Sequence, residues 1–283
     1  MTALGLYAQL ACAWEATARK PGNVHRYADF DDACYLDFVA SAAAIGPILD
    51  SAPTRRVGAT ILEAVAATRQ VTTTNTNLGI ILLLAPLAKV PPEEDLRTGV
   101  AAVLDQLDVE DAKLVYEAIR QAKPGGLGRV DQQDVHEEPT QTLREVMALA
   151  ADRDRVARQY ATGFAEIFDV GLPALLAGIE PSGALECGIL HCHLQLLAAG
   201  PDTLIARKCG PEVAEEASRR ARAVLADGWP ADSEAVAAYD AWLRADGNRR
   251  NPGACADLTT ACLFTALRSG SVTIPLASPF AGV

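Results

Sequence analysis

The chain has 283 residues, half of them hydrophobic, and its 36 acidic side chains outnumber 25 basic ones to give a formal net charge of −11. This length can bury a sizeable core, the apolar content excludes a disordered chain, and the acidity argues against a nucleic-acid binder, which needs a basic face. No apolar run approaches the roughly 20 residues of a membrane span, and no signal peptide is evident. The seven cysteines lack the regular spacing of a disulfide scaffold, which suits a reducing compartment. We therefore expect a cytoplasmic protein.

Helical periodicity dominates the chain, because alanine is abundant and β-branched alternation is scarce. In chain order, the predicted helices cover residues 3–18, 32–49, a segment from 54 to about 66, 77–88, a segment from 109 to about 119, 140–168, 182–199, 210–226, 233–245 and 254–267. Asp108 is expected to cap its helix, with Asp111 three residues on, and a Pro-Gly-Gly run at 124–126 to stop it. The sequence therefore predicts an all-α fold, as a single multi-helix globular domain over residues 1–283.

Polar residues gather between these helices, whereas the helices themselves are apolar and ordinary. The irregular segments cover residues 20–31, 71–76, 125–139, 200–210 and 247–253. The third is long enough to be a lid or a binding loop. We expect the five loops to converge on one polar cleft.

The first loop contains Lys20, Gly22 and Arg26, followed by Asp29 and Asp31. A Pro-Gly pair turns the chain after the first helix and places cations near carboxylates. Such a corner suits a phosphate and Mg²⁺ site, because Lys and Arg bind phosphoryl oxygens and Asp holds Mg²⁺. A helix C-cap followed by an Asp-rich N-cap is the alternative, and it needs no ligand.

The second loop places six polar side chains, residues 72–77, directly before the most apolar predicted helix. At a helix N-terminus, such side chains and free amides bind an anion or a ribose. Capping alone explains one or two of them.

The other three loops give weaker signals. The glycine-rich stretch 125–129 follows a helix and lacks the Walker spacing, so it is not a P-loop, and a plain connection is the alternative. Asp202 and Arg207 precede Gly210, and Gly253 precedes Asp257, so each set joins a charged group to a glycine at a helix boundary. Alone, each of these pairs indicates capping more often than chemistry.

Three further patterns carry little weight. Cys187 and His191 would share a helix face beside Cys192 and His193, but no second pair at zinc-site spacing accompanies them. No Gly-x-Ser-x-Gly turn supports a serine nucleophile. The alternating charges at 152–155 are typical of a solvated helix start, with a nucleotide-facing surface as the alternative.

Taken in order, the loops resemble the triphosphoribosyl-dephospho-CoA synthase family from about Glu15 to Asp257. The stretches that carry the resemblance are Glu15 with Lys20-Pro21-Gly22, Asp29 and Asp31 ahead of Phe38 and Ser41, Asn75-Thr76-Asn77 with Gly79, Gly128-Arg129, Asp202 with Arg207 and Gly210, and Pro252-Gly253 with Ala256-Asp257-Leu258. None of them is specific alone, but together they follow the family's order.

The resemblance implies an all-helical enzyme that moves the triphosphoribosyl unit of ATP to the 2′-hydroxyl of 3′-dephospho-CoA and releases adenine. Breaking an N-glycosidic bond builds positive charge that carboxylates stabilise, while a base takes the hydroxyl proton. The implied catalytic residues are Glu15, Asp29, Asp31, Asp202 and Asp257. The implied nucleotide-binding residues are Lys20, Gly22, Asn23, Arg26, Asn75, Thr76, Asn77, Gly128, Arg129, Arg207 and Gly253.

Two ligand predictions follow from this assignment. Asp29 and Asp31 are expected to hold the Mg²⁺ that carries the triphosphate. Lys20, Arg129 and Arg207 are expected to clamp phosphates together.

The chain also departs from the family pattern. It has Asn77-Leu78 where His-Lys is usual, Lys208-Cys209 after Arg207 where Gly is usual, and His25 where Asp is common. These features resemble an archaeal-type branch associated with tetrahydromethanopterin biosynthesis. Two alternatives stay open: an enzyme with a pterin or other one-carbon coenzyme precursor as acceptor, and a non-catalytic nucleotide-binding or helical assembly protein. Small-molecule partners are expected, without nucleic acid or membrane, and homo-oligomerisation is left open.

Overall fold

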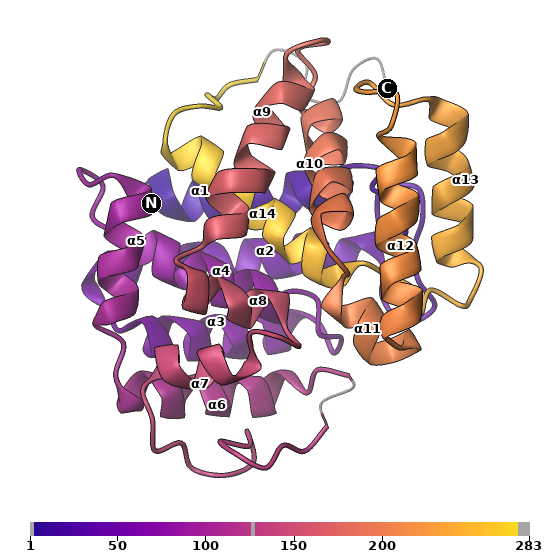
Figure 1. Cartoon of the computed structure of the whole chain (residues 1–283). Coiled ribbons are helices and arrows are strands. Elements are labelled where there is room, and N and C mark those ends of the chain that lie inside the picture. Colours follow the sequence, from indigo (N-terminus) through magenta and orange to yellow (C-terminus); the bar gives the residue numbers. More distant parts are fainter. Residues whose placement is uncertain (1–2, 126–127, 277–283) are drawn as a thin grey trace. The chain divides into compact units, whose positions relative to one another are not determined.

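A computed structural model describes residues 3–125 and 128–276 of the chain (Figure 1). Within these residues it contains fourteen α-helices and no strand, which confirms the predicted all-α fold. The helices are α1 (Ala3–Thr17), α2 (Tyr35–Asp50), α3 (Val57–Val71), α4 (Leu78–Lys89), α5 (Leu96–Asp105), α6 (Val109–Ala122), α7 (Leu143–Ala150), α8 (Arg155–Thr162), α9 (Leu172–Ile179), α10 (Leu185–Ala199), α11 (Thr203–Cys209), α12 (Pro211–Val224), α13 (Ser233–Arg244) and α14 (Gly253–Arg268). A short 3₁₀ helix covers Ala52–Thr54, and a π-helical turn covers Ile167–Gly171.

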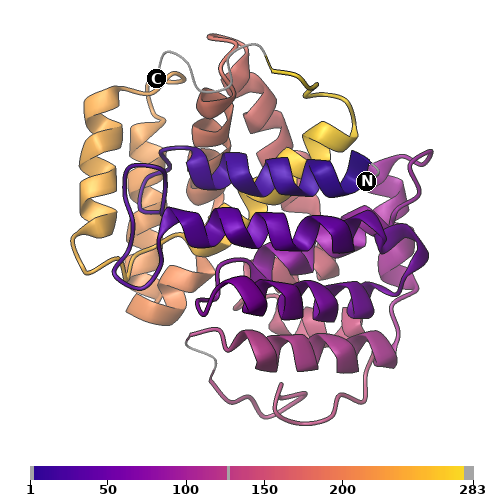
Figure 2. The same cartoon turned by 180° about the vertical axis from the view of Figure 1, so that it is seen from behind.

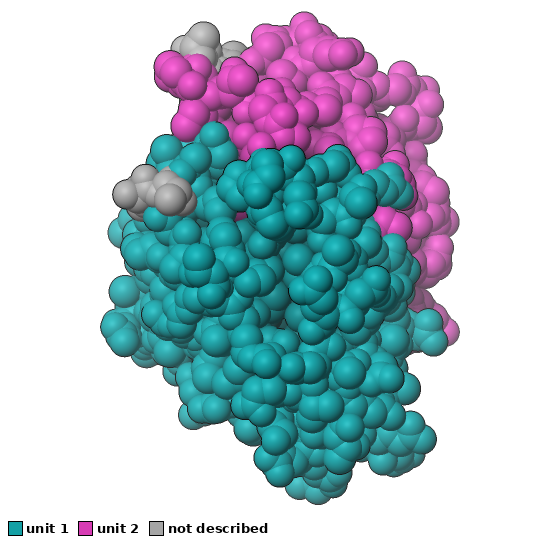
Figure 3. Space-filling model, turned by 90° about the vertical axis from the view of Figure 1, so that its left-hand side faces the viewer, with its two compact units in different colours: residues 1–13, 36–164 teal, residues 14–35, 165–283 magenta. Residues whose placement is uncertain are grey.

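The chain divides into two compact units, coloured separately in Figure 3. Unit 1 comprises Met1–Ala13 and Leu36–Phe164, and unit 2 comprises Trp14–Tyr35 and Ala165–Val283. The chain passes from one unit to the other within α1, at the start of α2, and after Phe164. The single domain stays a prediction.

Unit 1 is built around α4, in which every residue from Ile80 to Ala88 is buried. Helix α3 packs on both α4 and α6, and α3 and α6 lie side by side in Figures 1 and 2. Tyr160 of α8 donates a hydrogen bond to the Leu82 carbonyl of α4 at 2.6 Å. The predicted cap of α6 is confirmed, because Asp108 and Asp111 form a reciprocal capping box.

Unit 2 is built around α10, which packs on α9, α12, α14 and the π-helical turn. Helix α14 is also almost entirely buried from Leu258 to Leu267. The segment Trp14–Tyr35 belongs to this unit, although it lies some 150 residues away from α10 in the sequence. The unit therefore brings the first predicted loop to a C-terminal helical core.

The structure corrects four helix predictions. The predicted helix 140–168 is wrong, because α7 ends at Ala150, Asp154 caps a new helix, and Gly163 ends that helix with a left-handed φ of 65°. The predicted loop 200–210 contains α11. Helices α5 and α9 were not predicted, since α5 is short and α9 is apolar almost all round and lacks a polar face.

Among the described residues no single helix is long and apolar enough to cross a membrane. One bent pair of helical segments, 155–162 and 167–179, has the length and composition of a membrane span only when the two are taken together.

Candidate functional site

The first predicted loop is organised in unit 2 by a carboxylate that the sequence analysis did not select. Glu186 of α10 is fully buried. Its Oε1 accepts hydrogen bonds from the backbone N–H of Arg19 at 2.9 Å and from Arg19 Nε at 3.2 Å, and its Oε2 accepts one from Arg26 Nη2 at 3.0 Å. Burial favours a raised pKa for Glu186, but the hydrogen bonds from Arg26 and Arg19 outweigh it and hold that pKa below its usual range. One buried anion thus fixes two guanidinium groups.

Glu15 and Lys20 form a second ion pair beside the first. Lys20 has no exposed surface, and its Nζ lies 3.1 Å from Glu15 Oε1 and donates to the carbonyl oxygens of Glu15 and Ala18. Burial is the largest influence on both groups, raising the pKa of Glu15 and lowering that of Lys20. The ammonium of Lys20 is therefore already surrounded by protein oxygens, and its role as a phosphate clamp stays a prediction.

The next two residues of the loop are tied to α13. Gly22 has a φ of +75° and donates its N–H to Asp240 Oδ1 at 2.7 Å. A Cβ at this position would lie 2.8 Å from Leu243 Cδ1, so both the backbone conformation and the space require glycine. Arg244 is paired with Asp240 and donates to the Asn23 carbonyl at 2.6 Å. These contacts fix the path of the loop.

The tip of this loop presents an aromatic ring beside a cation. The backbones of His25 and Ala28 pair with each other, and the guanidinium of Arg26 lies 4.8 Å from the centroid of the Tyr27 ring. Burial first, and then the charges of Arg244 and Lys20, lower the pKa of His25 to about 4. Tyr27 is 73% exposed. The tip therefore offers groups that suit a nucleotide.

The predicted magnesium ligands lie on the outer part of the same loop. Asp29 and Asp31 are both exposed, and Asp29 Oδ1 accepts the backbone N–H of Tyr35 at 2.7 Å, at the start of α2. Among the described residues no group of three or more His, Cys, Asp or Glu side chains is placed to hold a metal ion. Two carboxylates still fit Mg²⁺, which usually keeps several waters and binds substrate phosphates.

Asp202 connects two helix N-termini in unit 2. It is fully buried, its Oδ1 accepts the N–H groups of Leu204 and Ile205 at 2.8 and 3.1 Å, and its Oδ2 accepts the N–H of Cys255 at 2.8 Å. The carboxylate therefore caps α11 and α14 together. This geometry assigns it a structural task, whereas its catalytic role stays a prediction.

The neighbouring candidates lie on the same two helices. Arg207 is exposed in the last turn of α11, and Asp257 is half-buried in the second turn of α14. A Cβ on Gly253 would lie 2.6 Å from Leu204 Cδ2, so this glycine permits close contact between the helices. The structure thus brings Asp202 and Gly253 to one junction.

In unit 1, most of the second loop is held by its own hydrogen bonds. Thr72 donates to Asp37 Oδ1 at 2.9 Å, and the hydroxyls of Thr76 and Ser41 lie 2.6 Å apart. Asn77 Nδ2 donates to Thr68 Oγ1 at 3.1 Å. These side chains fix the loop on α2 and α3.

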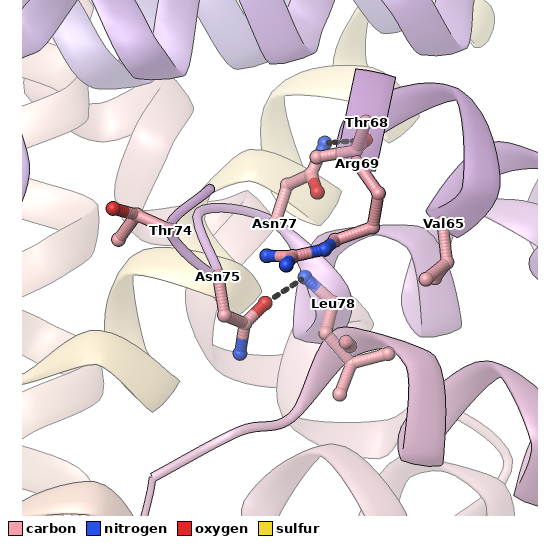
Figure 4. Close-up of a pocket in the computed structure, with 8 residues that line it drawn as sticks. Val65, Thr68, Arg69, Thr74, Asn75, Asn77 and Leu78 are labelled. Atoms are coloured by element: carbon pink, nitrogen blue, oxygen red, sulfur yellow. Dashed lines mark hydrogen bonds between the residues drawn. The ribbon is translucent and has the colours of Figure 1, made fainter. Parts of the chain in front are cut away.

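A shallow pocket opens beside this loop (Figure 4). It encloses about 190 Å³, including the part open to solvent. Its lining residues are Val65, Thr68, Arg69, Thr74, Asn75, Asn77, Leu78 and Ala122. Two predicted nucleotide-binding residues, Asn75 and Asn77, therefore share one cavity.

The third loop is exposed where the sequence predicts phosphate binding. Gly128 and Arg129 are both exposed, and Gly126 and Leu127 lie outside the described residues. Farther along, Asp134 accepts the N–H groups of Val130 and His136 at 2.9 Å each and lies 2.7 Å from His136 Nδ1. Hydrogen bonds from the His136 and Val130 backbones lower the pKa of Asp134 to about 2. This part of the loop is therefore an ordered turn.

Glu186, Asp240 and Arg19 were not among the residues predicted from the sequence. Glu186 had one usable signal, since it is the single carboxylate in α10, an otherwise largely apolar helix. Asp240 and Arg19 look like ordinary surface charges in the sequence. The structure brings Glu15, Lys20, Gly22, Asn23 and Arg26 together in unit 2, and the convergence of loops from both units on one cleft stays a prediction.

Comparison with known proteins adds independent information. A family model, CitG, described as ATP:dephospho-CoA triphosphoribosyl transferase, matches residues 1–273. A crystal structure from Archaeoglobus fulgidus, provisionally assigned as a triphosphoribosyl-dephospho-CoA synthase, is 27% identical with a TM-score of 0.66, over 82% of this chain and 99% of that one. A search of curated proteins found no match.

Proposed function

Because the chain belongs to the ATP:dephospho-CoA triphosphoribosyl transferase family, we propose that the loop 20–31, together with Arg19, binds substrate phosphates in unit 2. The protein is a transferase of coenzyme biosynthesis that acts on ATP and dephospho-CoA. In the proposed reaction, the triphosphoribosyl unit of ATP moves to the 2′-hydroxyl of dephospho-CoA and adenine is released. What remains to be assigned is which residues do this.

The pairing of Arg19 and Arg26 through Glu186 is the observation that carries the assignment. Two guanidinium groups share one carboxylate, so the trio has a net charge of +1. About a third of the Arg19 side chain and a fifth of the Arg26 side chain are exposed. Guanidinium groups fixed in advance lose little freedom on binding and match the oxygens of a phosphate.

The predicted catalytic carboxylates differ in their contacts. Asp202 is occupied by three backbone N–H groups, and Glu15 is paired with Lys20. With Asp29 and Asp31 assigned to magnesium, we propose that Asp257, half-buried on α14, takes the proton from the acceptor hydroxyl. A carboxylate in such a role also stabilises positive charge on the ribose.

Magnesium fits this arrangement. Asp29 and Asp31 would hold it through carboxylate oxygens, the donors that Mg²⁺ prefers. When bound, it would neutralise part of the triphosphate charge. Titration of Mg²⁺ into the Asp29→Asn/Asp31→Asn double variant, followed by calorimetry with ATP, tests the assignment: Mg²⁺-dependent ATP binding should disappear.

Product analysis tests the function directly. The purified protein is mixed with ATP, Mg²⁺ and dephospho-CoA, and free adenine and the coupled nucleotide are quantified by chromatography and mass spectrometry. Both products should form in equal amounts, and a pterin acceptor in place of dephospho-CoA should give none. Adenine released only with a pterin would overturn the acceptor, and no adenine with either would overturn the proposal. We place this activity in the cytoplasm, as expected of an acidic protein whose cysteines, all within the described residues, form no disulfide.

A further inference from the structure

Tyr27, at the tip of the loop 20–31 in unit 2, has no role among the predicted site residues. We propose that its ring is the surface on which the adenine of a substrate nucleotide stacks. The inference rests on the proposed function, in which ATP and dephospho-CoA both contain adenine and Arg19 and Arg26 bind substrate phosphates.

The backbone holds Tyr27 in a fixed position. The N–H of His25 donates to the Ala28 carbonyl at 3.0 Å, and the N–H of Ala28 donates to the His25 carbonyl at 2.9 Å. Arg26 and Tyr27 are therefore the two central residues of a tight turn. The N–H of Tyr27 itself donates to Nδ1 of the buried His25 at 3.2 Å. A group that is fixed in advance loses little freedom when it binds a ligand.

The Tyr27 ring is exposed although it is large and mostly apolar. Its exposed fraction, 73%, is the largest among the exposed large hydrophobic side chains of the described residues. Every base has a flat aromatic face, and stacking on an aromatic side chain is a common way in which proteins hold an unpaired base. A rigid, exposed ring is thus ready to receive the face of a purine.

The neighbouring cation places a phosphate-binding group beside the ring. The Arg26 guanidinium lies 4.8 Å from the centroid of the Tyr27 ring. It is held by Glu186 Oε2 at 3.0 Å and by the Thr17 carbonyl at 3.1 Å, and about a fifth of its side chain is exposed. Because only one sugar separates the base of a nucleotide from its first phosphate, Tyr27 and Arg26 can contact both ends of one nucleotide.

A contact with another protein is the other common use of an exposed aromatic side chain. The buried centre of such an interface is depleted of charged residues. The other exposed side chains between residues 20 and 32 are Asp29, Asp31 and Asp32, and the guanidinium of Arg26 lies against the ring. A nucleotide with its Mg²⁺ matches these charged surroundings better than the apolar centre of a protein interface does.

Tyr27→Ala tests the stacking when two ligands are compared. Calorimetric titrations in the presence of Mg²⁺ use ATP and inorganic tripolyphosphate, which keeps the phosphates but lacks the base. ATP should bind Tyr27→Ala at least about fivefold more weakly than the wild-type protein, which is the smaller end of the contribution of one stacked base. Tripolyphosphate should bind both proteins equally.

Two control variants separate stacking from other effects. Tyr27→Phe keeps the ring and should retain the wild-type affinity for ATP. Leu149→Ala shortens another apolar side chain, 42% exposed on α7, and should change the affinity for neither ligand. Thermal unfolding confirms that each variant is folded.

Three results would overturn the inference. The first is an unchanged ATP affinity in Tyr27→Ala. The second is an equal loss of affinity for ATP and tripolyphosphate, because Tyr27 would then act by holding Arg26 and not by contacting the base. The third is a loss in Tyr27→Phe as large as that in Tyr27→Ala, which would assign the effect to the hydroxyl group.

The two proposals fail separately. If the wild-type protein forms adenine and the coupled nucleotide while Tyr27→Ala binds ATP normally, the stacking assignment is wrong and the function stands. If ATP binding depends on the Tyr27 ring while neither product forms, the stacking stands and the proposed function is wrong.

Discussion

The loop 20–31 of unit 2 and the loop 72–77 of unit 1 look alike in sequence, as polar runs between helices, but they are built differently. In unit 2 the loop is held by charges, with Glu186 and Asp240 of the helices anchoring Arg19, Arg26 and the Gly22 backbone. In unit 1 the loop is held by neutral hydroxyls and amides, and it borders an open pocket.

The difference shows how each kind of group can serve a ligand. A buried charge must be paired, because removing one partner leaves an uncompensated ion. The charges of unit 2 therefore serve chiefly to fix Arg19 and Arg26, which stay partly exposed. A neutral amide has several hydrogen-bonding positions, so Asn75 and Asn77 can anchor the loop with one atom and offer the other.

Glu186→Gln should have the largest effect. It removes the charge from a fully buried side chain and leaves Arg19 and Arg26 without their counter-ion. Breaking such a pair should lower the free energy of unfolding by about 3 kcal/mol and weaken ATP binding as well. Urea denaturation and calorimetry measure the two effects.

Glu180→Gln is the control for that experiment. Glu180 is exposed and immediately follows α9 in the same unit. Its substitution should change stability by no more than about 0.5 kcal/mol. If Glu186→Gln were as mild, the view of unit 2 as a loop fixed by buried charge would be wrong.

His25 should make unit 2 sensitive to acid. Its pKa is about 4 in the folded protein and 6.5 ordinarily, because burial and then the charges of Arg244 and Lys20 oppose protonation. As the pH falls from 6.5 towards 4, the unfolded chain gains the proton first, so stability present above pH 6.5 is lost across this window. The loss should reach about 3 kcal/mol at most.

His25→Asn isolates this contribution. The Asn oxygen can replace His25 Nδ1, which accepts the N–H of Tyr27 at 3.2 Å. Urea denaturation at several pH values should then show a shallower fall in stability between pH 6.5 and 4. An unchanged slope would assign the acid sensitivity to other groups.

Asp202→Asn should cost less, because only one of its three hydrogen bonds is lost. Asn can still accept the N–H groups of Leu204 and Ile205, but its amide nitrogen would face the N–H of Cys255. We expect a loss of about 2 kcal/mol, with turnover per folded molecule unchanged. Asp232→Asn is the control, since Asp232 caps α13 through a single bond and Asn caps as well as Asp. Turnover reduced by a hundredfold or more in folded Asp202→Asn would restore a catalytic role.

The local features of this fold could be read from the sequence. The Asp108–Asp111 box, the stop after α6 and the apolar α4 follow from capping chemistry and composition. The break between α7 and α8 could also have been found, because Asp154 is a strong cap residue and Gly163 a strong stop. The π-helical turn before α9 depends on packing against α10 and α14, which no local pattern reveals.

The site was predicted less completely than the fold. Sequence order and spacing indicated Lys20 and Asp202 as site residues. They did not reveal that Lys20 is buried against Glu15 or that Asp202 caps two helices. Glu186 lies 160 residues from Arg26, and only the tertiary fold pairs them. A residue type at a loop boundary shows that a polar group is needed there, and the three-dimensional partners decide whether it binds a ligand or the protein itself.

Thr76→Val should give the smallest effect and sharpen the contrast within unit 1. Thr76 is buried, and its hydroxyl lies 2.6 Å from that of Ser41, so valine keeps the shape and removes one hydrogen bond. The free energy of unfolding should fall by about 1 kcal/mol, while ATP affinity, measured by calorimetry, should stay unchanged because Thr76 is buried against Ser41. Asn75→Asp should do the opposite, because Asn75 is exposed: it should weaken ATP binding with little change in stability. If Thr76→Val instead weakened ATP binding as strongly as Asn75→Asp, the loop would act as one unit, and the division between anchoring and ligand-facing side chains would be wrong.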